Sequence, residues 1–399
     1  MSSEKSEVRS EKARLPPVVK SLGLVSFFND LASEMMYPLI PALVMSLGGG
    51  AISLGLFDGI SEGLSAAAKL WAGFLSDRPR LRRPLILAGY GIAAVTRPVI
   101  GATTAAWQVI SLRATDRIGK GLRTPPRDAV IADATSAEMR GRAFGFHRAM
   151  DHAGAVVGPL VAWALLTWAH LTPDGVIGWS VVPGAMAVVA VLWAMKGERG
   201  SGKGEGDKPF PLSPSPFPNA ANSRPPGIFY LIVAFAFARF PETLFLLRLH
   251  DLQVPVALTP LVWAALHVIR STMSYPGGRL SDAYGPRQVM IGGWFAYWMV
   301  CMGLATTTSG WEGVAWFLVF GLVAALTESP ERALVAAAAR QMGTGKSFGV
   351  YHASVGVATL AGGITFGLVY ARSGGPTALI ASGLGAGLLA LVLLLRGSD

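Results

Sequence analysis

The chain has 399 residues, of which 52% are hydrophobic and 15% charged, with a formal net charge of +10 and a mean hydropathy of +0.46. This composition excludes an ordinary soluble domain and indicates a helical membrane protein. The basic residues lie in short segments between apolar runs, which argues against nucleic-acid binding, and the single Cys301 excludes internal disulfides and cysteine-based metal or redox sites.

Residues 1–17 are charged and lack the apolar core of a cleavable signal peptide, so we expect a cytoplasmic N-terminal tail. About twelve apolar runs follow, each near the ~20 residues that a bilayer span requires. The expected spans are 18–44, 52–75, 84–107, 108–128, 143–166, 175–195, 227–249, 255–278, 287–308, 314–336, 347–370 and 375–396.

The spans divide into two groups of six, over residues 18–195 and 227–396, separated by residues 196–226. This separating segment is rich in Gly, Ser and Pro and has no periodicity, so we expect a flexible linker. Lys and Arg concentrate in the tail, the 76–84 loop, the 127–142 loop and the linker. By the positive-inside rule the linker and both termini face the cytoplasm.

The fourth span carries a charged stripe. On an α-helix its polar residues fall within an arc of roughly 140°: Arg113, Asp116, Arg117, Lys120, Arg123, Thr124 and Arg127. Lipid cannot satisfy such a stripe, so it must face protein or water. We interpret it as the wall of an aqueous cavity.

Other charged residues within the spans define candidate sites. Asp30 and Glu62 fall at similar depth near the membrane midplane, where a coupling ion would bind, and we predict that they couple transport to protons. Glu34, Asp58 and Asp151 are reserve candidates for this role. The candidate substrate-binding residues are Arg117, Arg113, Arg97, Arg123, Asn29, Tyr37, His267 and Arg270.

The chain also repeats itself. Asp77 and Asp282 lie 205 residues apart, as do Arg127 and Arg332 within the related segments PPRDAV and PERALV. A third echo, GRAFGFHRAM and GKSFGVYHAS, has an offset of 204 residues. The two groups of six spans therefore form parallel repeats, each beginning on the same side of the membrane.

Two six-helix halves with a Gly-x-x-x-Asp-Arg loop after the second helix resemble the major facilitator superfamily, over roughly residues 18–396. The resemblance implies an all-α membrane fold of twelve helices in two pseudo-symmetric halves, working by alternating access. It also implies gating residues, which are Gly73, Asp77, Arg78 and Arg82 with their weaker copies Asp282 and Arg287. We expect Gly73 to let two helices approach closely.

Two sequence patterns concern proton coupling and the direction of transport. Arg117-x-x-x-Gly121 resembles the family's fourth-helix signature for proton coupling. Gly154-x-x-x-Gly158-Pro159 resembles the fifth-helix signature of proton-driven exporters, although spaced glycines also serve plain helix packing. In this position the glycines would allow close packing, and Pro159 would bend the helix.

No enzyme signal is present. The segment GLRTPPRD lacks the strand–loop–helix context of a phosphate-binding loop, and we expect neither a cofactor nor a metal centre. His147 and Asp151, at i and i+4, favour a proton relay or ion pair over a metal site.

The sequence therefore predicts a proton-coupled exporter of a small organic solute. The alternatives are proton-coupled uptake or exchange of an anionic metabolite, and export of a metal ion or chelate. A non-transporting receptor or scaffold ranks last. We expect a monomeric multi-pass protein of the bacterial inner membrane whose partners are a small-molecule substrate, protons and the lipid bilayer.

Overall fold

The computed structural model describes residues 15–76, 78–135, 140–196, 227–323, 326–327 and 344–396. In these ranges every regular element is a helix and none is a strand. The all-α prediction therefore holds for the part of the chain that is described.

The first half contains nine helical segments within the described residues. They are α2 (Pro17–Met36), the short 3₁₀ helix η1 (Tyr37–Leu39), α3 (Ile40–Ser46), α4 (Ala51–Ser76), α5 (Pro79–Ile100), α6 (Ala106–Asp133), α7 (Arg140–Thr167), α8 (Pro173–Trp179) and α9 (Val181–Lys196).

The second half begins after residue 226. Its elements are α11 (Gly227–Ala238), α12 (Glu242–Asp251), η3 (Val256–Leu258), α13 (Thr259–Tyr284), α14 (Pro286–Thr306), a helix over Gly310–Val323, and α16 (Thr344–Leu395). Within α16 the backbone is non-helical at Gly374, whose φ of +83° favours glycine. Two predicted spans, 347–370 and 375–396, therefore lie on either side of this glycine.

Six described helices are long and apolar enough to cross a membrane: Phe146–Thr167, Pro173–Met195, Gly227–Asp251, Val256–Met273, Pro286–Thr306 and Ser354–Leu395. The stripe-bearing α6 is not one of them because its charged residues recur along its length. The count of twelve spans and the cytoplasmic position of both termini stay predictions.

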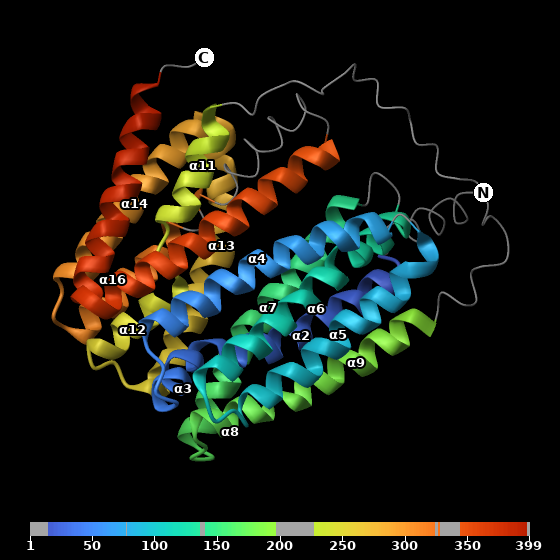
Figure 1. Cartoon of the computed structure of the whole chain (residues 1–399). Coiled ribbons are helices and arrows are strands. Elements are labelled where there is room, and N and C mark those ends of the chain that lie inside the picture. The colour runs from blue at the N-terminus through green and yellow to red at the C-terminus, as the bar shows by residue number, and fades with distance from the viewer. Residues whose placement is uncertain are drawn as a thin grey trace, which may run out of the picture.

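The helices form two bundles, the first coloured blue to green and the second yellow to red in Figure 1. The bundles meet near α3 and α12 and diverge toward the ends of the chain marked N and C. Across this interface α4 packs against α16, and α13 packs against α7. The largest buried apolar cluster includes Phe57 of the first bundle and Trp263 and Phe317 of the second, so the core crosses the interface.

The leading helix of each half is interrupted at an equivalent position of the repeat. In the first half α2 ends at Met36 and passes through η1 into α3, and in the second half α11 and α12 are separated by residues 239–241. The 205-residue offset relates Met36 to Pro241, so both interruptions occur at the same point.

The second interruption is stabilised by side chains of its own half. Tyr297 Oη accepts a hydrogen bond from the Phe240 amide at 2.7 Å. Ser382 Oγ donates to the Ala238 carbonyl at 2.6 Å and lies 2.9 Å from Tyr297 Oη. A backbone interrupted inside a membrane protein needs such partners, because lipid offers none.

Glycines allow two close helix contacts. A Cβ on Gly158 would lie 2.5 Å from the Leu31 carbonyl oxygen, and one on Gly154 would lie 2.3 Å from that of Phe27, so α7 crosses α2 backbone to backbone. A Cβ on Gly55 would lie 2.1 Å from the Gly363 carbonyl oxygen, where α4 crosses α16. Pro159 lies inside α7.

Gly73 differs from this pattern. A Cβ at this position would meet none of the described atoms within 4 Å. No helix of the described residues lies against that face of α4 there, so the expected close approach at Gly73 is not seen among them and its gating role stays a prediction.

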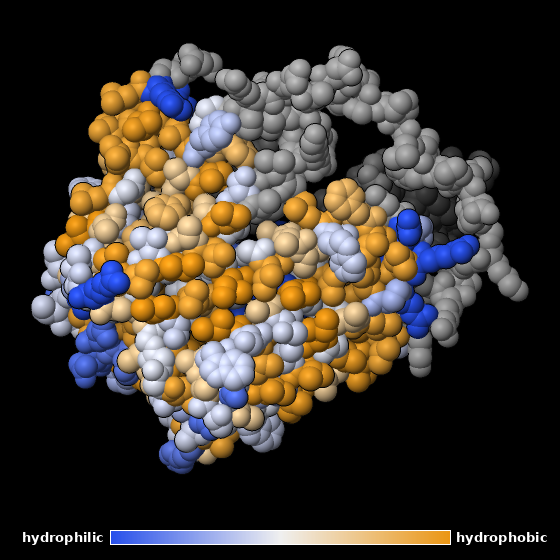
Figure 2. All heavy atoms as spheres, in the orientation of Figure 1, coloured by the Kyte–Doolittle hydropathy of each residue, from blue (hydrophilic) through white to orange (hydrophobic). Residues whose placement is uncertain are grey.

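The outside of both bundles is strongly apolar. Figure 2 shows hydrophobic side chains over most of the visible face, with strongly hydrophilic residues mainly toward its edges. Large side chains such as Trp71 (59% exposed), Trp107 (65%) and Trp311 (74%) project from the surface. This exposed belt fits a surface solvated by lipid.

The α2–α7 crossing can be tested by substitution. We expect Gly158→Ala to lower the thermal unfolding temperature of the detergent-solubilised protein, since an added methyl in a packed contact typically costs ~1–3 kcal/mol. Gly91→Ala is the control, because a Cβ at Gly91 meets nothing within 4 Å. Equal unfolding temperatures for the two variants would contradict the close crossing.

Candidate functional site

A cavity of about 320 Å³ lies between the two halves. Its polar lining includes Asp58, Glu62, Arg239 and Glu242, and its aromatic lining includes Tyr37, Phe235, Phe240, Tyr297 and Phe320. Most of the aromatic wall belongs to the second half. The cavity therefore presents apolar and charged surfaces to the same occupant.

A smaller cavity of about 140 Å³ shares Tyr37, Asp58, Glu62 and Glu242 with the larger one. It is further lined by Glu34, Ser61, Arg113, Arg117, Trp263 and His267. Because four residues border both spaces, we treat them as one candidate binding region.

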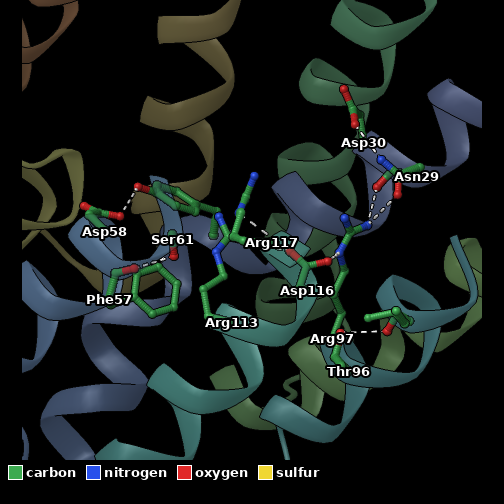
Figure 3. Close-up of polar contacts among 12 residues, drawn as sticks. Asn29, Asp30, Phe57, Asp58, Ser61, Thr96, Arg97, Arg113, Asp116 and Arg117 are labelled. Atoms are coloured by element: carbon green, nitrogen blue, oxygen red, sulfur yellow. Dashed lines mark hydrogen bonds and ion pairs between the residues drawn. The ribbon is translucent and has the colours of Figure 1, made fainter. Parts of the chain in front are cut away.

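Asp116 organises the charged side of this region. Its side chain is fully buried, and it forms ion pairs with Arg97 Nε at 2.9 Å, Arg113 Nη1 at 3.2 Å and Arg117 Nε at 3.7 Å. Figure 3 shows Asp116 between Arg97 on one side and Arg113 and Arg117 on the other. One carboxylate thus joins three arginines from α5 and α6, and Arg113 and Arg117 extend from it to the smaller cavity.

Arg97 also binds the first helix. Its Nη1 donates to the Asn29 backbone oxygen at 2.7 Å and to Asn29 Oδ1 at 3.1 Å. Asn29 Nδ2 in turn donates to Asp30 Oδ1 at 2.8 Å (Figure 3). A continuous polar chain therefore connects Asp30 on α2 with Asp116 on α6.

Arg113 makes two further contacts, which are cation–π in character. Its guanidinium carbon lies 5.3 Å from the centre of the Tyr37 ring and 5.1 Å from that of Phe57. Arg123 is held elsewhere: it lies 4.6 Å above the Tyr90 ring and donates to the Gly89 carbonyl at 3.1 Å. Arg123 does not line either cavity.

Asp58 binds across the interface. Its Oδ2 accepts hydrogen bonds from the Thr243 amide at 3.0 Å and from Thr243 Oγ1 at 2.7 Å, while Oδ1 accepts one from Tyr37 Oη at 2.9 Å. Thr243 is the second residue of α12, so the carboxylate of one half satisfies the helix N-terminus of the other.

Glu34 makes a second contact across the interface. Its Oε2 accepts a hydrogen bond from Trp263 Nε1 at 2.9 Å, and His267 Nε2 lies 3.9 Å from the same oxygen. The Trp263 ring also packs against Tyr37, with ring centres 4.9 Å apart.

Glu242 holds the arginines of the second half. Its Oε1 accepts from Arg270 Nη2 at 2.7 Å and from Arg239 Nη2 at 3.3 Å. Both guanidinium groups also lie over the Phe320 ring, at 5.3 and 5.9 Å from its centre. Cationic and aromatic groups of this half therefore share one wall.

Glu62 lines both cavities and forms no hydrogen bond or ion pair with another described residue. The positive charges of Arg117, Lys120, Lys69 and Arg113 act on it electrostatically. Lys120 interacts in the same way with Asp30, so it lies within electrostatic range of both predicted coupling carboxylates.

The remaining candidates form a polar group on α2 and α7. Asp151 Oδ1 accepts a hydrogen bond from Ser26 Oγ, and His147 Nδ1 lies 3.5 Å from Asp151 Oδ2. The charge of Asp151 acts on Asp30. This group borders neither described cavity.

The predicted gating residues are described in part. Asp77 lies outside the described residues, as does the side chain of Asp282, and Arg78 is exposed. Arg82 donates to the Ser76 carbonyl at 2.9 Å and pairs with Asp133, while Arg287 donates to the Leu393 carbonyl at 2.6 Å. Arg82 and Arg287 are related by the 205-residue offset, and each contacts helix ends of its own half.

Several residues of the region were not among the predicted site residues, notably Asp116, Trp263, Thr243 and Phe320. The repeat contained a signal for one of them, because Trp263 lies 205 residues after Asp58. Both residues bind the leading helix of the opposite half, Asp58 at α12 and Trp263 at α2. The interface contacts are thus pseudo-symmetric although their chemistry differs.

Comparison with known proteins gives the family. The chain matches the Major Facilitator Superfamily over residues 22–344 and belongs to this family. Its members are transporters, so the chain is a multi-pass membrane transporter of a small-molecule substrate and not an enzyme.

Among its relatives, an MFS-type transporter of Methanocaldococcus jannaschii is 27% identical over 363 residues, covering 88% of this chain and 87% of the relative. The multidrug resistance protein MdtH of Edwardsiella ictaluri is 27% identical over only 135 residues, which are 34% of this chain and 33% of that protein.

Solved transporters share the fold. The nucleoside transporter NupG has a TM-score of 0.73 at 13% identity, covering 95% of this chain and 98% of that one. A POT family transporter in complex with 5-aminolevulinic acid has a TM-score of 0.74 at 12% identity, with 95% and 96% coverage. At such identities the likeness establishes the fold alone.

The Asp116 cluster gives a direct stability test. We expect Asp116→Asn to lower the free energy of unfolding by about 3–5 kcal/mol, because three buried arginines lose their shared carboxylate. Thermal unfolding of the purified protein measures the change. Asp128→Asn is the control, since that carboxylate is 43% exposed and its pairing with Arg127 contributes little. Similar unfolding temperatures for both variants would show that Asp116 does not hold the cluster.

Proposed function

We propose that the chain is a proton-coupled secondary transporter that exports a small amphipathic organic solute across the cell membrane by alternating access. The observation that carries this proposal is the pair of adjoining cavities lined by both halves. A site built from two bundles changes its access when the bundles rock against each other.

The contacts across the interface lie toward one end of the two bundles, which supports a state in which the cavity is closed at that end. The Asp58–Thr243 and Glu34–Trp263 hydrogen bonds, with the Gly55–Gly363 crossing, lie toward the 47–50 and 252–258 connections. The positive-inside rule assigns those connections to the outer side. We therefore assign the structure to a state closed on the outside, with the diverging bundle ends toward the cytoplasm.

The substrate class follows from the two walls of the larger cavity. Phe235, Phe240 and Phe320 of the second half offer apolar and aromatic contact, while Asp58 of the first half offers a charge. An amphipathic solute satisfies both walls. Export is supported by the α7 glycine pattern and by the partial similarity to the multidrug resistance protein MdtH.

Glu62 is the first proposed proton carrier, with Asp30 as the second. Glu62 faces both cavities and has no ion-pair partner among the described residues, so an arriving proton meets it directly. Asp30 lies behind the Asn29–Arg97–Asp116 chain, through which the charge of the cavity wall acts on it.

Uptake or exchange of an anionic metabolite is the second candidate, because Arg113 and Arg117 line the smaller cavity. Asp116 neutralises part of the charge of these two arginines, so the region attracts anions less strongly than the arginines would without it. Export of a metal has less support: the described residues contain no group of three or more His, Cys, Asp or Glu placed to hold an ion.

The inner gate is proposed at the loops after the second helix of each half, where Asp77, Arg78 and Asp282 lie. In the state described, Arg82 and Arg287 bind helix ends within their own halves. Closure of the inner side would then bring these two loops against the opposite bundle.

The proposed function is tested by finding a ligand and then measuring its transport. Purified protein is screened by thermal shift against organic cations, organic anions, zwitterions and divalent metals, since a ligand bound only by the folded state raises its unfolding temperature. Hits are assayed in proteoliposomes with an imposed pH gradient. Transport of a hit that ignores the gradient would refute proton coupling, and stabilisation by metals alone would favour the metal alternative.

The proton carriers give a further prediction. We expect Glu62→Gln, and separately Asp30→Asn, to abolish accumulation driven by a pH gradient while leaving counterflow without a gradient intact. A neutral side chain cannot alternate between protonated and charged forms, but the solute site and the rocking motion remain. Asp174→Asn, in the first turn of α8, is the control. If both variants keep gradient-driven transport with unchanged pH dependence, the coupling proton binds elsewhere.

The aromatic wall gives a third functional prediction. We expect Phe320→Ala to raise the KM for an aromatic substrate by about tenfold, because a large apolar contact surface is lost. The KM for a smaller polar substrate should change less. Phe237→Ala is the control, since Phe237 is 40% exposed and lines neither cavity. Equal effects on both substrates would remove Phe320 from the binding wall.

A further inference from the structure

His267 and Glu34 face each other across the interface between the two halves. His267 Nε2 lies 3.9 Å from Glu34 Oε2, too far for a hydrogen bond in the present arrangement. Only 14% of the His267 side chain and 20% of the Glu34 side chain are exposed. The pair sits on the wall of the smaller cavity.

The other ring nitrogen fixes the tautomer of His267. Nδ1 lies 3.0 Å from the backbone oxygen of Trp263, which can only accept a hydrogen bond. Nδ1 must therefore carry the hydrogen, and the neutral ring presents an unprotonated Nε2 to Glu34. Two acceptors, the Nε2 lone pair and the carboxylate Oε2, then face each other without a proton between them.

One added proton turns this contact from repulsive to attractive. Protonation of Nε2 makes the imidazole ring cationic and gives it a second N–H, which can donate to Glu34 Oε2. That oxygen already accepts from Trp263 Nε1 at 2.9 Å and keeps a second lone pair. The result is a charge-assisted hydrogen bond between the first half and the second.

We propose that the gap between His267 Nε2 and Glu34 Oε2 is a proton-binding site whose occupation holds the outer ends of the two halves together. The proposal rests on the proposed proton-coupled function and assigns one proton of that function to a specific pair of atoms. The pair takes up this proton from the outer side as the halves close there, and the proton leaves toward the cytoplasm through the cavity that the pair borders.

Other titratable and charged groups also act on the pair. From neighbouring helices these are Asp58 and Glu62 of α4, Arg113 and Arg117 of α6, His152 of α7 and Glu242 of α12. On the same two helices as the pair, Asp30 interacts electrostatically with Glu34 and Arg270 binds Glu242, and Tyr37 packs against Trp263. Most of these groups already have a partner, such as Thr243 for Asp58, Asp116 for the two α6 arginines and Arg270 for Glu242.

The proposal is tested by measuring closure of the outer end directly, without substrate. Spin labels are placed at Met45→Cys on α3 and Ala257→Cys on η3, two exposed positions on opposite halves, with the fully buried Cys301 retained. Pulsed electron–electron distance measurements give the ratio of closed to open molecules from pH 5 to pH 9. We expect this ratio to rise about tenfold as the pH falls, since a charge-assisted hydrogen bond forms across the interface.

Three variants separate the proton from general packing. His267→Gln and Glu34→Gln should each remove the pH dependence, since neither leaves the histidine–carboxylate pair intact. Trp263→Phe should lower the closed fraction at every pH but keep the pH dependence, because it removes only the constant hydrogen bond to Glu34. His250→Gln, at an exposed position near the end of α12, is the matched histidine control and should behave as the unmodified protein does.

Each variant is first checked for a monodisperse elution profile, and the two Gln variants test the same pair independently. Unchanged pH-dependent closure in both His267→Gln and Glu34→Gln would overturn the proposal. Gradient-driven transport is measured separately in proteoliposomes. If the unmodified protein closes in a pH-dependent way but shows no gradient-driven transport, the proposed function alone is refuted. If it shows gradient-driven transport but its closure does not depend on pH, the proton site alone is refuted.

Discussion

The charged side of this transporter depends on one buried carboxylate. Asp116 holds Arg97, Arg113 and Arg117 together, and Arg97 carries the connection to Asn29 on the first helix. Without Asp116 three like charges would be buried in a protein interior, where an uncompensated charge is costly. Because the arginines are fixed, the cavity wall beside Glu62 has a defined charge, and α2, α5 and α6 are linked by polar contacts.

The two halves are joined on a different principle. Each half inserts a residue of its second helix, Asp58 in one and Trp263 in the other, against the leading helix of its partner. The repeat supplied equivalent positions, and the residues at those positions have diverged. One contact is a carboxylate at a helix N-terminus, and the other is an indole that donates to a carboxylate. The two halves are therefore pseudo-symmetric in their backbone, but the hydrogen bonds between them are not, since the first half supplies both carboxylates.

Part of the fold could be predicted from the sequence, because most of the predicted apolar runs fall on described helices and the 205-residue repeat places the two helix interruptions in register. The charged stripe of α6 was also predicted. Which of its side chains meet was not, since helical periodicity gives a direction for Arg113 and Arg123 but not the neighbour that each one finds. Arg113 reaches the cavity, whereas Arg123 packs on Tyr90 of α5. The close approach expected at Gly73 is not seen among the described residues for the same reason: a glycine shows that a contact is permitted, and only the packed helices show whether it is made.

The crossing of α4 and α16 at Gly55 and Gly363 has a kinetic consequence. Helices that meet through interlocked side chains must withdraw them before they can shift, and such packed interfaces resist continuous deformation. At Gly55 and Gly363 the two backbones touch with no side chain between them, so this point of the crossing can shift without a rotamer change. This contact keeps the two bundles in register, and it adds little to the activation barrier for turnover.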